Sequence, residues 1–206
     1  MPAPNNAKQR PRSGSLDSVE SVQGEPLLKL ISISCLVALG SLLASYSSTL
    51  GDLLHLEWGQ RSGHSFQSLE SFYPFYLTQH HDPWSRRLHF VGTTIVIVLM
   101  CVDSNIMISL LLGALFGLTA FQLTRSLSNG LLEAVITLGV FLQCYRTLSN
   151  SYKKAFLVLL VGYGFAWVGH FFFEKNRPAT FAYPVYSLAS DFKLWFHIIS
   201  GKEKIW

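Results

Sequence analysis

Four long apolar segments, separated by short polar breaks, dominate the chain after residue 87. They cover 88–102, 106–124, 130–145 and 155–173, and the breaks begin with DSN, RSLSN and RTLSNSYKK. The stretch IMISLLLGALFGLTAF, at 106–121, is apolar all round. A surface helix of a soluble protein would instead alternate apolar and polar residues with a period of 3.6. The pattern predicts an all-α membrane protein with about four transmembrane helices.

The charge content supports the same conclusion. Only 14% of the residues are charged, against about 25% in an average soluble protein. The formal net charge is +4, and the basic residues form no stripe with interleaved aromatic residues. We therefore expect a lipid bilayer and no nucleic acid as the partner of this chain. Three cysteines, without CxxC spacing, indicate neither a disulfide framework nor a thiolate zinc site.

Two of the apolar segments, 88–102 and 130–145, are shorter than the roughly 20 residues of an ideal transmembrane helix. They can tilt, insert partly, or extend as helices into their flanks. Small residues let transmembrane helices approach each other closely. Gly113, Gly117, Gly162 and Gly164 are suited to such packing.

The N-terminal part has a different character. Residues 1–26 are rich in Pro, Ser, Asn and Gln and lack aromatic residues, which predicts a disordered tail. Segment 27–50 is apolar but rich in serine, and three interpretations compete: a span, an interfacial helix or a signal segment. The tail before it is long and contains Asp17, Glu20 and Glu25, unlike the short basic start of a signal segment. The length of segment 27–50 favours a span, which would be a fifth transmembrane helix. We assign 51–206 to one membrane-embedded domain.

The topology places two polar stretches on one side of the membrane. Four crossings return the chain to its starting side, so the residues before 88 and after 173 share a face. The short basic segments on that face contain Arg86, Arg87, Arg125, Lys175, Arg177 and Lys193, whereas the opposite face has Arg146, Lys153 and Lys154. The positive-inside bias therefore predicts that the shared face is cytosolic.

The two stretches that meet on this face carry groups able to bind metal. QHHDPWSRRLHF, at 79–90, contains three histidines and Pro83, which marks a helix boundary. GHFFFEKNRPATFAYP, at 169–184, contains His170 and Glu174, which would lie one turn apart on an α-helix. Ionisable groups at membrane depth are costly and serve as ligands or proton carriers. The candidate ligands are His80, His81, His89, His170 and Glu174.

Several functions are compatible with these residues. Imidazole and carboxylate ligands suit iron, zinc or manganese. A zinc-dependent lipid hydrolase could use Glu174 as its base. In a non-catalytic lipid-binding scaffold, the histidines and arginines would only contact headgroups. In an enzyme, the guanidinium groups of Arg86 and Arg177 are suited to bind a substrate carboxylate.

Two motifs carry a resemblance to a known family. The first comprises His80, Pro83, Arg86, His89 and Gly92, and the second comprises Gly169, His170 and the run Glu174-Lys175-Asn176-Arg177-Pro178-Ala179. Together with the later Asp191-Phe192, they resemble the 2-hydroxy fatty acid dioxygenase family over about residues 72–201. Ser85 is a departure, since many relatives carry asparagine at that position.

The resemblance implies a multi-pass, iron(II)-dependent dioxygenase of the endoplasmic reticulum membrane. Such an enzyme uses O2 to convert a long-chain 2-hydroxy fatty acid into the acid one carbon shorter, in fatty acid α-oxidation and sphingoid base degradation. Residues 51–206 would then be the catalytic domain. We expect His80, His89 and His170 to bind Fe(II), with His81 or Glu174 completing or orienting that shell. Glu174 and Lys175 are the expected catalytic residues, and Arg86, Arg177 or Lys175 would bind the substrate carboxylate.

Overall fold

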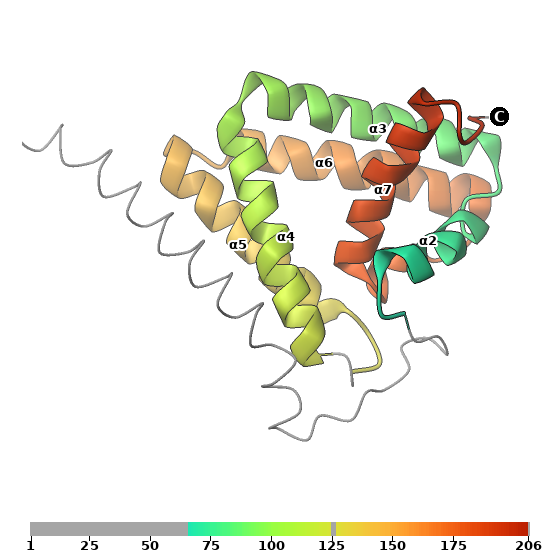
Figure 1. Ribbon diagram of the computed structural model, residues 1–206. Coiled ribbons are helices and arrows are strands. Elements are labelled where there is room, and N and C mark those ends of the chain that lie inside the picture. Colours follow the sequence, from blue (N-terminus) through green and yellow to red (C-terminus); the bar gives the residue numbers. More distant parts are fainter. Residues whose placement is uncertain (1–65, 125–126, 206) are drawn as a thin grey trace, which may run out of the picture.

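A computed structural model describes residues 66–124 and 127–205 (Figure 1). All regular structure in these residues is helical. The elements are α2 (Leu69–Thr78), α3 (Pro83–Val102), α4 (Ser104–Thr124), α5 (Leu131–Ser149), α6 (Lys153–Val168), the π-helix η1 (Gly169–Glu174), the 3-10 helix η2 (Ala179–Phe181) and α7 (Pro184–Ile199). The predicted tail and segment 27–50 lie outside the described residues.

Four helices are long and apolar enough to cross a membrane, as predicted. They are α3, α4, α5 and the continuous helix formed by α6 and η1 over Lys153–Glu174. The two short apolar segments extend into their flanks: α3 begins at Pro83, and α5 ends at Ser149. Asp82 caps α3 by accepting the Trp84 N–H, and Pro83 fits the first turn because it needs no hydrogen bond there.

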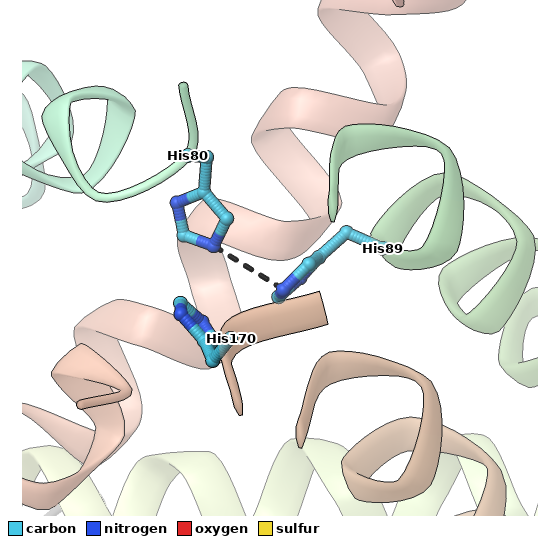
Figure 2. A group of neighbouring side chains, drawn as sticks. All are labelled: His80, His89 and His170. Carbon is cyan, nitrogen blue, oxygen red and sulfur yellow. Dashed lines mark hydrogen bonds between the residues drawn. The ribbon is translucent and has the colours of Figure 1, made fainter. Parts of the chain in front are cut away.

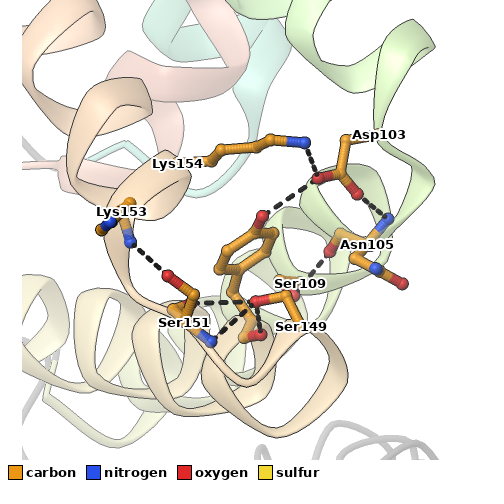
Figure 3. A network of polar contacts seen from close by, with 8 residues as sticks. Asp103, Asn105, Ser109, Ser149, Ser151, Lys153 and Lys154 are labelled. Carbon is orange, nitrogen blue, oxygen red and sulfur yellow. Dashed lines mark hydrogen bonds and ion pairs between the residues drawn. The ribbon is translucent and has the colours of Figure 1, made fainter.

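The four long helices form two pairs that diverge from a shared end. Helix α3 packs along α6, and α4 packs along α5, while α7 contacts α3, α4 and α5 between the pairs (Figure 1). A polar network holds the shared end (Figure 3). Asp103 Oδ2 accepts hydrogen bonds from Lys154 Nζ at 2.8 Å and from Tyr145 OH at 3.0 Å. The bond from Lys154 holds the pKa of Asp103 below its ordinary value.

The glycines of α4 and α6 differ in their packing. A Cβ on Gly117 would collide with the side chains of Thr137 and Val185, so close packing there requires glycine. Gly113 is similarly close to α5. The expectation of close packing is wrong for the two glycines of α6. A Cβ on Gly162 would meet only Val96 Cγ2, at 3.9 Å, and one on Gly164 would meet nothing within 4 Å.

Candidate metal centre

Three histidines from separate elements meet at the open end of the α3–α6 pair. His80 follows α2, His89 lies in α3, and His170 lies in η1. All three are buried, and one ligand atom of each lies within 4.8 Å of the others. The Nε2 atoms of His80 and His89 are 3.2 Å apart, and the three rings converge (Figure 2). The two polar stretches of the sequence therefore meet in one cluster of histidines.

The outer nitrogens of His80 and His89 are fixed by hydrogen-bond acceptors. His80 Nδ1 lies 2.7 Å from the Tyr76 carbonyl oxygen, and His89 Nδ1 lies 2.8 Å from Asp191 Oδ1. A carbonyl or carboxylate oxygen can only accept, so each Nδ1 carries the proton and donates. In the neutral rings, both Nε2 atoms then present lone pairs toward each other.

The third histidine has the same arrangement. His170 Nδ1 lies 2.7 Å from Asn176 Oδ1. The orientation of the Asn176 amide follows from its other contact, because Asn176 Nδ2 donates to the Gln79 carbonyl at 3.0 Å. The amide oxygen therefore faces His170 and accepts its Nδ1–H, which leaves the Nε2 lone pair free. Histidines that bind metal typically donate their second N–H to such a partner.

This donor set fits a transition-metal ion. Two nitrogens that each lie about 2.1 Å from one ion are roughly 3 to 3.4 Å apart, and the observed separation of 3.2 Å falls in this range. Burial, followed by the neighbouring imidazoles of His89 and His170, lowers the pKa of His80 well below its ordinary value. The His80 ring is therefore neutral at pH 7, and its lone pair is available to a metal.

A long apolar cavity begins at the three histidines. Its atom-free space, with the open side included, is about 1130 Å³, and most of its lining residues are apolar. It continues along α6 past Ala166 and Gly162 to Val158. From His170 to Val158, at about 1.5 Å per residue, this path is about 18 Å long. The hydrocarbon layer of one membrane leaflet is about 15 Å thick. The length of the cavity is therefore similar to that of an extended lipid chain.

Comparison with known proteins adds the family. Residues 66–203 match the family described as 2-hydroxy-palmitic acid dioxygenase Mpo1-like. The chain belongs to the Mpo1-like family. No curated protein and no solved structure matches it. The matched region contains all three histidines of the cluster, and the family description names a dioxygenase, which is an O2-dependent enzyme class.

A glycine of this Mpo1-like chain brings η1 onto α3. A Cβ on Gly169 would lie 3.0 Å from Ser85 Oγ and 3.4 Å from Ser85 Cα. Glycine therefore allows the close approach that sets His170 beside His89. The Ser85 hydroxyl is buried and has no hydrogen-bond partner among the described protein atoms.

Glu174, His81 and Lys175 do not join the histidine cluster. His170 and Glu174 both lie in η1, which is a π-helix. Glu174 Oε1 instead accepts the Asp82 N–H at 2.8 Å and ties η1 to the start of α3. His81 is exposed. Lys175 is also exposed, and it ends η1 in a left-handed conformation with φ 53°.

The two arginines predicted to bind substrate lie outside the cavity. Arg86 Nε donates to the His80 carbonyl at 2.8 Å, and its Nη1 donates to the Lys204 carbonyl at 3.1 Å. Arg86 thus holds the backbone of a cluster histidine against the C-terminal residues. Arg177 is exposed. No lysine or arginine of the described residues lines the cavity.

Tyr76 was not singled out from the sequence, although it lies at the centre of the site. Its hydroxyl donates to Asp191 Oδ1, the same oxygen that accepts the His89 N–H. Its ring packs on His80 with the centroids 4.1 Å apart. Burial, and then the Asp191 carboxylate, raise the pKa of Tyr76, so its hydroxyl stays a donor. Its position four residues before His80, one helical turn away, was the available signal.

Proposed function

We propose that this protein is an iron(II)-dependent dioxygenase that converts a long-chain 2-hydroxy fatty acid into the acid one carbon shorter. The observation that carries the proposal is a cluster of three imidazoles at the head of an apolar cavity about 18 Å long. A substrate with a carboxylate and a hydroxyl at one end of a long chain matches both halves of this site. The family description points to the same class of reaction.

In the proposed enzyme, the histidines of the cluster bind the metal and their hydrogen-bond partners orient the rings. His80, His89 and His170 would hold the metal through Nε2, while Asp191 and Asn176 keep the Nδ1 protons in place. Iron(II), when bound, supplies the redox chemistry with O2. We propose His80, not His81, as the ligand from QHHD, because His80 is buried in the cluster and His81 is exposed. Glu174 supports the cluster from outside by holding η1 on α3.

The substrate head would meet few polar groups of the protein. Ser187 lines the cavity one helical turn before Asp191, and its buried hydroxyl has no partner among the described protein atoms. We propose that this hydroxyl donates to the substrate carboxylate. Lys175 and Arg177 precede Pro178 of the cavity wall, and their exposed charges would attract the carboxylate before it enters. Arg86 would act by positioning His80.

The overall reaction balances without a cosubstrate. R–CH(OH)–COOH and O2 give R–COOH, CO2 and H2O, so the C1–C2 bond breaks and the substrate itself supplies every electron that reduces O2. The apolar cavity excludes water from the bond that breaks and holds the chain in line with the metal ligands. We propose that the enzyme resides in the endoplasmic reticulum membrane, as the family resemblance implies. The site would face the cytosol, because Arg86, Lys175 and Arg177 lie at this end.

Metal exchange separates this function from a zinc-dependent hydrolase, which could use the same three ligands. The detergent-solubilised protein is stripped by a chelator and reloaded with Fe(II) under anaerobic conditions, or with Zn(II). On exposure to O2 and 2-hydroxypalmitate, we expect the shortened acid only with iron, measured by mass spectrometry. Equal turnover with zinc, or turnover without O2, would contradict the proposal.

A further inference from the structure

We infer that the inner end of the cavity measures the acyl chain, and that Gly162 and Val158 set the length it accepts. The inference rests on the proposed function for the direction in which the substrate lies. With its head at the histidines, the chain points along α6 toward a wall formed by Val96, Phe141 and Val158, which we call the cavity floor. Chain-length preference would then be a property of these side chains.

The cavity floor belongs to a packed core. Val96, Phe141 and Val158 are 7%, 1% and 4% exposed. Behind them, the same cluster contains Ile106, Tyr145 and Ala155. Tyr145 connects the cluster to the polar network at the shared end of the helix pairs, through its bond to Asp103 (Figure 3). Close-packed interiors of this kind resist displacement, so the floor is a fixed stop for the chain.

Gly162 lies beside Val96 and one helical turn before Val158, the deepest floor residue on α6. It lies about 12 Å from His170 along the helix and about 6 Å before Val158. Val96 is at a similar depth on the facing helix, about 10 Å from His89. A Cβ on Gly162 would meet only Val96 Cγ2, at 3.9 Å, so the backbone tolerates a side chain here. Because Gly162 lines the cavity, a larger side chain would fill its last third.

The burial of methylene groups explains how this geometry would select chain length. Each methylene that enters the cavity is removed from water and adds a similar increment to binding. A chain that ends at the cavity floor gains binding free energy from every methylene. A longer chain must bend, or its head must move away from the histidines. Blocking the last third therefore penalises long chains and leaves shorter ones unaffected.

The test uses two opposing variants and a matched control. Gly162→Leu should weaken binding of 2-hydroxypalmitate roughly tenfold or more relative to a 2-hydroxy acid several carbons shorter. Gly162→Ala should fold at least as well as the wild type and shift the preference less. Val158→Ala should shift it toward longer chains. Gly164→Leu, on the same helix but outside the cavity wall, should change nothing.

Binding is measured by native mass spectrometry with saturated 2-hydroxy acids of graded chain length, and turnover is measured in parallel. If metal-loaded Gly162→Leu and Gly162→Ala keep the wild-type chain-length profile, the cavity floor does not set the chain length. The same holds if Gly164→Leu shifts the profile as much as Gly162→Leu does. The binding profile could shift as expected although no form of the protein turns over the substrate. That result would support the role of the cavity floor and refute only the proposed reaction.

Discussion

Replacing His170 with alanine should remove metal and activity together. His170 is one of three nitrogen donors, and the loss of a direct ligand should weaken metal binding by more than the roughly 10- to 100-fold that follows loss of an outer partner. His80→Ala and His89→Ala should behave in the same way. Metal content is measured by elemental mass spectrometry on purified protein, and turnover on 2-hydroxypalmitate in the same preparation. A His170→Ala protein with full metal content would refute the site.

His81→Ala is the matched control for His80→Ala. The two histidines are adjacent in the sequence, but His80 is buried in the cluster and His81 is exposed. We expect His81→Ala to keep its metal and its activity. If His81→Ala lost the metal while His80→Ala retained it, the ligand assignment would have to be reversed.

Replacing Asp191 with alanine should cause the second large loss of metal affinity. Its Oδ1 accepts both the His89 Nδ1–H and the Tyr76 hydroxyl, so Asp191→Ala leaves His89 free to rotate and unpairs a buried hydroxyl. We expect metal affinity to fall about 10- to 100-fold, as is usual when such a partner is lost. Asp191→Asn keeps one acceptor oxygen and should lose less. Titration of the stripped protein with Fe(II) gives the affinities.

Tyr76→Phe tests whether Asp191 acts by orienting His89 or only by its packing against Tyr76. It keeps the ring on His80 and leaves the Asp191 contact with His89 intact, so its effect on metal affinity should be smaller than that of Asp191→Ala. An Asp191→Ala protein that folds and binds Fe(II) as tightly as the wild type would show that this carboxylate does not position His89.

The span pattern was predictable because lipid leaves a chain few choices. In a bilayer core every backbone group must be satisfied within the segment, so long apolar runs become helices. Pro83 correctly marked a helix boundary, since proline suits a first turn and Asp82 can cap it. The shared face followed from counting crossings, and the cluster of His80, His89 and His170 is the result.

Other features depend on contacts that no local pattern encodes. Glu174 accepts the Asp82 N–H, a contact between distant parts of the chain that an i, i+4 rule cannot anticipate. Arg86 uses its donors on His80 and on Lys204, far away in the sequence. Gly162 resembled a packing glycine in sequence, and only the arrangement of the helix pairs shows that it borders a cavity.

Oxygen consumption by the iron-loaded wild-type protein tests the central claim most directly. With 2-hydroxypalmitate and no added 2-oxoacid, an oxygen electrode and product analysis should show equal amounts of O2 consumed, CO2 released and acid one carbon shorter. Palmitate, which lacks the 2-hydroxyl, should support no uptake. Absence of O2 consumption by protein that holds stoichiometric iron at the three histidines would contradict the account.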